Sequence, residues 1–484
     1  MTSNTRVVVI GAGLAGVRLA RRLAELGASG GPALVGPGGP AAPAAPGVSV
    51  VLLGEEEHAP YNRVLLAEVL AGRYAPEVIA LPAPGGLVRA RVTGIDRAAR
   101  TLRCADGSEI AYDTLVLATG SNPVLPPLRG LFSQGGHELP EGVHAFRTMD
   151  DCLGLSKAVR EGTRAVVIGG GLLGVSAARA LAMRGAQVVL AQQSERLMER
   201  QLDPAASRLV HRHLTDLGVE VHTECRVRDV RCVGGAVRSV EMADGYALDA
   251  DLVVLACGVH PRTGLAQQAG LAVHKGILVD DELRTSDPHI RAIGDCVQYD
   301  GTVYGLAAPA LEQADVLAGL IVAEAADSPA ATDSPAATDS PADADSPADA
   351  DGPGAADGSD AADGPGAASG SGAADTPPAR ARSAARYTGT RSLTRLTLAG
   401  GRAPFDLAAF GEPDPRPGDD VVQLADATRG TYRKVVVRDD RVVGGVLVGD
   451  LGTVGALARA WEGAEPLPGD GAPLLHLLTN DGGS

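Results

Sequence analysis

The chain has 484 residues, of which 45% are hydrophobic, and this is more chain than one hydrophobic core usually organises, so we expect several domains. Its 43 basic and 59 acidic residues give a net charge of −16, which argues against a nucleic-acid-binding or membrane-surface protein. The six cysteines include no CxxC pair, and no apolar run approaches the roughly 18 residues of a membrane span, so we expect free thiols and a cytoplasmic protein.

A strand, a glycine-rich turn and a helix open the chain. Val7–Ile10 is an apolar run, the turn follows at once, an apolar-periodic helix extends to about Leu26, and Val50–Leu53 supplies a second strand. This order predicts a βαβ unit of a parallel sheet. The strand begins too early to leave room for a signal peptide, and the low-complexity stretch 28–47 reads as a surface insertion.

The turn of this unit reads Gly11-x-Gly13-x-x-Gly16. The first glycine permits a tight turn, the second lets backbone N–H groups approach a pyrophosphate, and the third allows the helix to pack closely on the strand. Glu55 stands at the end of the second strand, where a carboxylate can bind both ribose hydroxyls. Together they predict a dinucleotide site.

A second unit repeats this pattern. The strand Ala165–Ile168 leads into Gly169-x-Gly171-x-x-Gly174 and a helix to about Met183, and Gln187–Leu190 is the next strand. Gln192 stands where the first unit has its acid; it can hydrogen-bond a ribose but does not repel a 2′-phosphate. The choice between NADH and NADPH stays open, with the lack of a neighbouring Arg favouring NADH. Two such units in one chain suit an enzyme that passes hydride between a nicotinamide and a flavin.

Three further strand ends fit the same scheme. A buried strand ends at Thr119-Gly120, its counterpart in the second half ends at Cys257-Gly258, and a third apolar strand leads into Gly294-Asp295. An Asp in this place can hydrogen-bond the ribityl hydroxyls of a flavin.

The composition changes sharply after the second unit. Between 326 and 378 the chain has eleven Asp and no Lys or Arg, which predicts an acidic, disordered linker over 326–380. Alternating runs at Leu393–Leu398 and Tyr432–Val437, with a turn at Asp439-Asp440, then predict a small α+β domain over 381–484. We therefore expect an α/β protein with two Rossmann-like dinucleotide-binding domains, followed by the acidic linker and the small C-terminal domain.

The order of these motifs resembles the pyridine-nucleotide:FAD oxidoreductases of the glutathione-reductase-like group. Pro60-Tyr61-Asn62-Arg63, Arg196-Leu-Met-Glu-Arg-Gln-Leu-Asp203 and Tyr387-x-Gly389-x-x-Ser392 look, more narrowly, like the flavoprotein portion of the NAD(P)H-dependent assimilatory nitrite reductase large subunit. The resemblance implies that FAD is held by the first unit, Glu55 and Asp295, with Arg63 near the pyrophosphate, and NAD(P)H by the second. It thus implies a discontinuous FAD-binding domain (1–120 and 250–325) around an NAD(P)H-binding domain (121–249). It also implies electron transfer to a separate acceptor protein, a haem, iron–sulfur or molybdenum reductase or a ferredoxin-like carrier, in nitrite or nitrate assimilation.

Some features of that family are missing. No Cys follows Cys296, so the sequence offers no iron–sulfur or sirohaem ligands there, and the CxxxxC of disulfide reductases is absent. Ser176 replaces a Glu common near the nicotinamide, and Leu311 replaces an aromatic residue. We predict no metal site and name no catalytic side chain, because hydride transfer itself needs no acid or base. Two alternatives remain: a ferredoxin or rubredoxin reductase, and a non-catalytic redox sensor.

Overall fold

The computed structural model describes residues 5–28, 47–82, 87–132, 138–327, 386–401, 404–426, 428–463 and 478. The predicted insertion at 28–47 and the predicted linker at 326–380 lie almost entirely outside these residues. Every helix in the described part is too short or too polar to cross a membrane.

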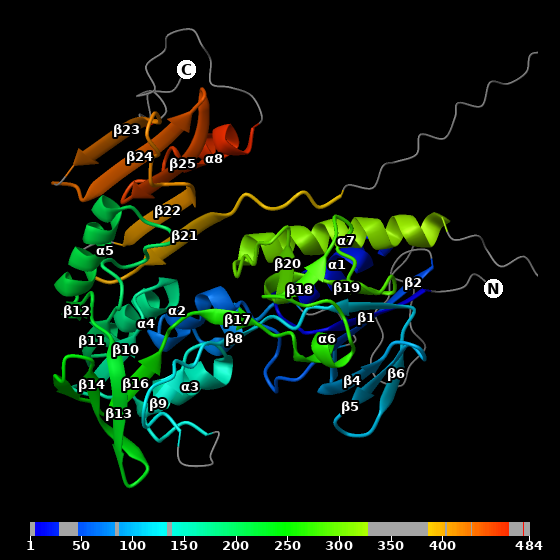
Figure 1. Cartoon of the computed structure of the whole chain (residues 1–484), viewed down its shortest axis with the longest axis horizontal. Coiled ribbons are helices and arrows are strands. Elements are labelled where there is room, and N and C mark those ends of the chain that lie inside the picture. Colours follow the sequence, from blue (N-terminus) through cyan, green and yellow to red (C-terminus); the bar gives the residue numbers. More distant parts are fainter. Residues whose placement is uncertain are drawn as a thin grey trace, which may run out of the picture.

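The first unit is a five-stranded sheet in the order β19-β7-β1-β2-β3, with all neighbouring strands parallel (Figure 1). Its strands are β1 (Thr5–Ile10), β2 (Val48–Gly54), β3 (Leu87–Arg89), β7 (Thr114–Leu117) and β19 (Ile290–Ala292). Helices α1 (Leu14–Ala28) and α7 (Ala307–Asp327) cover one face side by side, and Arg18 donates to Asp315 between them at 2.8 Å. Val7, Val8 and Val9 are fully buried because both faces are covered, which is typical of a central parallel strand.

Short elements complete this unit. The other face carries the antiparallel sheet β4 (Val92–Asp96), β5 (Thr101–Cys104) and β6 (Glu109–Ala111) and helix α6 (Gly264–Gln268). The remaining elements are η1 (Arg63–Leu65), α2 (Leu66–Leu70), η2 (Pro76–Ile79), η3 (Gly294–Cys296) and the parallel pair β18 (Ile277–Val279) and β20 (Val297–Tyr299).

The second unit has the same plan. Its parallel sheet runs β12-β11-β10-β16-β9. The strands are β9 (Val143–Ala145), β10 (Arg164–Ile168), β11 (Gln187–Ala191), β12 (Glu220–His222) and β16 (Leu252–Leu255). The helices are α3 (Met149–Ala158), α4 (Leu172–Met183) and α5 (Pro204–Asp216), and the antiparallel sheet is β13 (Val227–Val233), β14 (Ala236–Met242) and β15 (Ala247–Asp249). Both units therefore place a glycine-rich turn between the first strand of a βαβ element and its helix, as predicted.

A short ribbon joins the two units. Strands β8 (Ser121–Pro123) and β17 (Val259–Pro261) pair in antiparallel fashion where the chain passes from one unit to the other and back. The predicted boundary at 249/250 corresponds poorly to this geometry, because β16 pairs with β10 and so belongs to the second sheet. We propose that the boundary lies at the ribbon.

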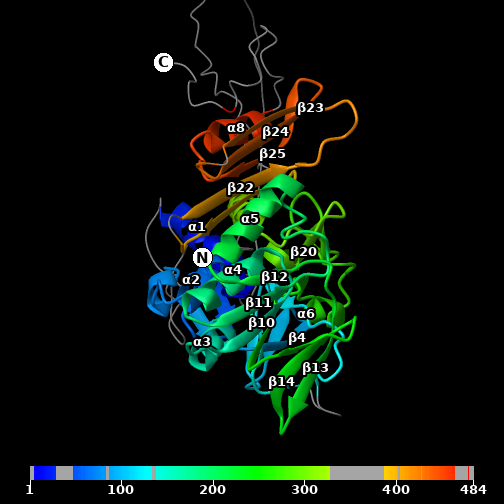
Figure 2. The same cartoon turned by 90° about the vertical axis from the view of Figure 1, so that its left-hand side faces the viewer.

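A third region follows residue 386. Its antiparallel sheet runs β21-β22-β25-β24-β23, with one helix beside it, which confirms the predicted α+β character. The elements are β21 (Leu393–Leu398), β22 (Phe405–Gly411), β23 (Asp420–Asp426), β24 (Thr431–Arg438), β25 (Arg441–Val448) and α8 (Val454–Glu462). Asp439 and Asp440, at the expected turn, both have positive φ. Figure 2 shows this sheet lying against α5 of the second unit.

Buried polar contacts attach this sheet to the second unit. Asp203, the N-cap of α5, accepts hydrogen bonds from Tyr432 at 2.5 Å and Lys434 at 2.9 Å, and its side chain is only 3% exposed. His213 stacks on Phe405 with ring centroids 4.8 Å apart. The third region is therefore packed on the second unit as part of one body.

Candidate functional site

The first glycine-rich turn connects β1 to α1. Gly11 has φ +115°, and a Cβ there would collide with the carbonyl oxygen of Ala118; a Cβ on Gly16 would collide with that of Gly11. Gly13 differs, because a Cβ on it would meet nothing within 4 Å. The space over Gly13 is therefore open for a ligand, while Gly11 and Gly16 let β1, α1 and β7 pack closely.

The second turn connects β10 to α4 and repeats this arrangement. A Cβ on Gly174 would collide with the carbonyl oxygen of Gly169, and Gly169 itself has φ +109° beside Ala256. Gly171 again faces open space. Each turn thus presents one bare backbone position at a helix N-terminus, where N–H groups can bind a pyrophosphate.

The residues at the ends of the second strands differ between the units. Glu55 follows β2, is exposed, and forms an ion pair with Arg262. Gln192 follows β11 and is 8% exposed; its Oε1 accepts a hydrogen bond from the backbone N–H of Gly170 at 2.7 Å. The glutamine thus supports the glycine-rich turn itself.

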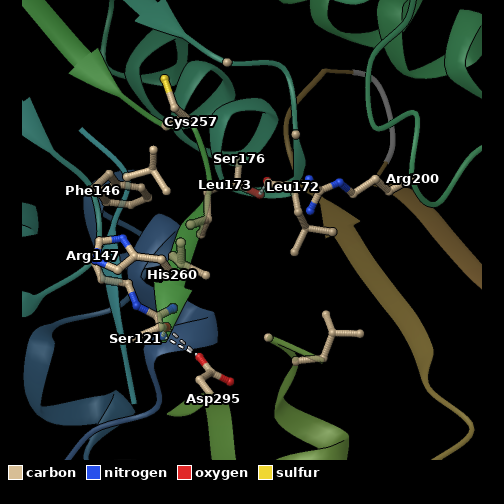
Figure 3. Close-up of a pocket in the computed structure, with 18 of the residues that line it drawn as sticks. Ser121, Phe146, Arg147, Leu172, Leu173, Ser176, Arg200, Cys257, His260 and Asp295 are labelled. Atoms are coloured by element: carbon tan, nitrogen blue, oxygen red, sulfur yellow. Dashed lines mark hydrogen bonds and ion pairs between the residues drawn. The ribbon is translucent and has the colours of Figure 1, made fainter. Parts of the chain in front are cut away.

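Asp295 follows β19 and is held by two side chains that the sequence analysis missed. Its carboxylate accepts hydrogen bonds from Ser121 at 2.9 Å and from Arg147 at 2.7 Å, and Figure 3 shows Arg147 directed at it. Ser121 directly follows the predicted Thr119-Gly120 turn, which is a signal that could have found it. Arg147 precedes α3, outside every motif that the sequence analysis used.

Arg63 is held mainly by its neighbours. Its guanidinium forms an ion pair with Glu56 and donates to the Tyr61 hydroxyl at 2.7 Å and to the backbone oxygen of Arg147 at 3.3 Å. Burial raises the pKa of Tyr61 well above its usual range, so this hydroxyl stays protonated and donates to Glu56. Arg63 also contributes to the cavity lining described below.

The remaining predicted positions lie at the ribbon between the units. Thr119 donates its hydroxyl to the backbone oxygen of Arg262 at 2.7 Å, so it braces the ribbon. Gly120 and Gly258 have φ of +74° and +100°, and the N–H of Val124 donates to the Gly258 oxygen. These turns fix the relative position of the two sheets.

One cavity of about 1420 Å³ connects the two glycine-rich turns. The predicted residues that line it are Gly13, Arg63, Gly120, Gly169, Gly171, Gln192, Gly258, Gly294 and Asp295. Gly11, Gly16, Glu55, Thr119 and Gly174 are not in the lining. The third region also contributes, through Arg395 and Leu396 of β21.

The cavity lining is basic. Arg129, Arg200, Arg226, Lys275 and Arg395 line it and form no ion pair within the described part of the chain. Their charges favour anionic ligands. The open backbone at Gly13 and Gly171 together with this excess of positive charge fits dinucleotides, whose pyrophosphates are negative.

The cysteines do not form a redox pair in the structure. All six are free thiols. Cys257 lines the cavity, and burial raises its pKa to about 11, so the thiol is protonated at neutral pH. Within the described residues, no group of three or more His, Cys, Asp or Glu is placed to hold a metal ion.

Two known protein families match parts of this chain. The family description pyridine nucleotide-disulphide oxidoreductase matches residues 5–314, and that of the rubredoxin NAD+ reductase C-terminal domain matches 403–462. The nitrite reductase [NAD(P)H] large subunit of Klebsiella oxytoca is 32% identical over 87% of this chain and 38% of its own length. The assimilatory nitrate reductase electron transfer subunit of Bacillus subtilis is 34% identical over 65% of this chain and 39% of its own length.

These curated relatives are thus much longer, and the chain spans about two fifths of each. Among solved structures, the covalent putidaredoxin reductase–putidaredoxin complex superposes with a TM-score of 0.70 at 22% identity, over 95% of this chain and 94% of that one. At this identity the likeness concerns the fold, and it agrees with the fold class predicted from the sequence.

Proposed function

Because the chain belongs to the pyridine nucleotide-disulphide oxidoreductase family, we propose that it oxidises NAD(P)H through FAD and passes the electrons to a separate acceptor protein. The observation that carries the proposal is a shared basic cavity onto which both glycine-rich turns open. Family membership supports FAD and NAD(P)H as the cofactors, and the relatives confirm the resemblance to the nitrite reductase flavoprotein portion.

The residues divide between the two dinucleotides by position. We assign FAD to Gly11, Gly13, Gly16 and the Gly294-Asp295 turn, and NAD(P)H to Gly169, Gly171, Gly174 and Gln192. Glu55 belongs to the FAD site through the ribose, with Arg262 as the group that orients it. Arg63 reaches the same cavity.

Hydride transfer from NAD(P)H to FAD requires that the protein hold the two cofactors in the right positions and in a suitable electrostatic field. FAD held at the first glycine-rich turn would supply the capacity to take up one hydride and to release its two electrons one at a time. One NAD(P)H yields NAD(P)⁺, a proton and two electrons, which reduce two one-electron acceptors. We assign no catalytic side chain, because no proton has to move on a side chain during hydride transfer. The free cysteines support a reducing, cytoplasmic setting.

We further propose that the acceptor belongs to nitrite or nitrate assimilation, since the relatives named above are a nitrite reductase and a nitrate reductase electron transfer subunit. A rubredoxin- or ferredoxin-like acceptor is the second candidate. It is favoured by the match of residues 403–462 to the rubredoxin NAD+ reductase C-terminal domain.

The test uses the full chain. The purified protein should contain about one FAD and should reduce ferricyanide with NADH or NADPH. It should form ammonium from nitrite only after a haem- or cluster-bearing partner is added. A colourless protein that takes up no FAD would contradict the proposal that the chain is a flavoenzyme. A FAD-bound protein that turns over neither coenzyme favours the redox sensor instead.

A further inference from the structure

The segment 386–392, which resumes the described chain after residue 327, packs on the first unit before it enters β21. We call it the clamp segment. Tyr387 is 1% exposed and lies in the same hydrophobic cluster as Leu317 of α7 and Val9 of β1. The segment contains the motif Tyr387-x-Gly389-x-x-Ser392, which has no part in the cofactor assignments above.

Backbone contacts fix this segment along its length. The N–H of Tyr387 donates to the Asp281 oxygen at 2.8 Å, and Tyr299 donates to the Tyr387 oxygen at 2.9 Å. The N–H of Thr390 donates to the hydroxyl of Tyr304 at 3.0 Å. Tyr304 also lines the cavity, so the clamp segment is bonded directly to its wall.

A chain of hydrogen bonds then leads from the clamp segment to the proposed FAD site. Gln313 of α7 is 1% exposed; its Nε2 donates to the Tyr387 hydroxyl at 3.2 Å, and its Oε1 accepts from the N–H of Gly294 at 2.7 Å. The Tyr387 hydroxyl is 2.7 Å from Thr390 Oγ1, to which it can donate while it accepts from Gln313. Because the Gly294 N–H can only donate, the Gln313 oxygen must face it, and the amide nitrogen must then face the Tyr387 hydroxyl.

This series of hydrogen bonds ends at Gly294, whose backbone conformation favours glycine. Gly294 has φ +81°, and a Cβ on it would lie 3.1 Å from Ala15 at the first glycine-rich turn. The next residue is Asp295, which Ser121 and Arg147 hold from the other side. The Gly294-Asp295 turn is thus fixed by Gln313 on one side and by Arg147 on the other.

We propose that Tyr387 and Gln313 are positioning residues for the flavin, which act by fixing the Gly294-Asp295 turn from the clamp segment. This inference rests on the proposed assignment of Asp295 to FAD. It makes the chain beyond residue 386 a part of the FAD site, although Tyr387 and Gln313 are 74 residues apart in the sequence.

The test compares three variants of the full chain. Tyr387→Phe keeps the ring in the core and removes the hydroxyl, and Gln313→Leu leaves the Gly294 N–H without its acceptor. Tyr112→Phe is the matched control, because the Tyr112 hydroxyl is buried in the same unit and has no hydrogen-bond partner in the described residues. For each variant, the FAD dissociation constant is measured by fluorescence, the visible flavin spectrum is recorded, and the melting temperature of the apoprotein reports on the fold.

We expect the FAD dissociation constant to rise roughly 3- to 10-fold in Tyr387→Phe and roughly 10- to 100-fold in Gln313→Leu, because a lost hydrogen bond costs less than a buried donor left without a partner. The flavin spectrum should shift in both variants, and Tyr112→Phe should match the wild type. If Tyr387→Phe and Gln313→Leu have the wild-type FAD affinity and spectrum, the positioning role of these two residues is overturned and the proposed function stands. A wild-type chain that binds no FAD overturns the proposed function itself.

Discussion

The two dinucleotide-binding units share a sheet order and a turn, yet they differ in how the groups around the turn are held. In the first unit, the acidic side chains of Glu55 and Asp295 are each paired with an arginine from a distant part of the chain. In the second, neutral Gln192 is used to support its own turn. Charged, preorganised groups suit a cofactor that stays bound, and a neutral strand end suits a coenzyme that must leave after each turnover. We infer that the difference separates a retained cofactor from an exchanging substrate.

The largest expected effect comes from filling the bare position of each turn. Gly13→Ala should weaken FAD binding roughly 100-fold, since a methyl group there keeps the pyrophosphate from the backbone N–H groups. Gly171→Ala should leave the FAD content unchanged and raise the KM for NAD(P)H. Flavin absorbance measures the FAD content of both variants, and steady-state kinetics measure the KM for NAD(P)H.

Both substitutions add the methyl group in open space, so the fold should persist. Gly319→Ala, on α7 and equally unobstructed, is the control. If Gly171→Ala loses FAD and Gly13→Ala does not, the two cofactors are assigned to the wrong units.

The next effect concerns the strand-end acid. Glu55→Ala should raise the FAD dissociation constant roughly 10-fold, because it removes a charge-assisted hydrogen bond to the ribose. Equilibrium fluorescence titration measures the change. Glu57→Ala, at an exposed glutamate two residues on, should match the wild type. Equal losses in both variants would indicate a general charge effect in place of a ribose contact.

Gln192→Glu would make the second unit resemble the first. A carboxylate there should bind the 2′-hydroxyl of NADH and repel the 2′-phosphate of NADPH, so the ratio of kcat/KM for NADH over NADPH should rise roughly tenfold. Gln187→Glu adds the same charge at the opposite end of β11 and serves as the control. An unchanged ratio in Gln192→Glu would mean that other residues, such as the cavity-lining Arg200 or Arg226, decide the coenzyme.

The smallest effect concerns the attachment of the third region. Burial works to raise the pKa of Asp203, but hydrogen bonds from Tyr432, the Ala206 N–H and Lys434 outweigh it and hold the pKa below its usual value. The carboxylate therefore stabilises the fold above the unfolded pKa of about 3.9, and this contribution is lost as the pH falls through the lower folded value.

Asp203→Asn should accordingly lower the melting temperature at pH 7 by a few degrees, and the difference from the wild type should shrink below pH 4. Thermal unfolding across this pH range measures it. A difference that stays constant with pH would mean that the ionised carboxylate is not the stabilising group.

The sequence predicted the parts of the fold and the site that depend on neighbours along the chain. The turns at Gly11–Gly16 and Gly169–Gly174 are visible because a strand and a helix flank each of them directly. The arginine partners of Glu55 and Asp295 were not predictable in this way, since Arg262 and Arg147 lie 207 and 148 residues away and belong to no local motif. The proposal to place the boundary at the ribbon instead of at 249/250 also rests on contacts distant in sequence, since hydrogen bonds join β16 to β10.

Helices α1 and α7 both begin at the cavity, where Leu14 and Ala307 contribute to its lining, and they pack side by side on the first sheet. Sequence added after the last turn of either helix would therefore enter the molecule at the end of the first sheet opposite the cavity. This end is where a fluorescent reporter, an affinity tag or an electron-carrier module should be spliced into the chain. Electrode immobilisation through the same end would leave the cavity facing the solution.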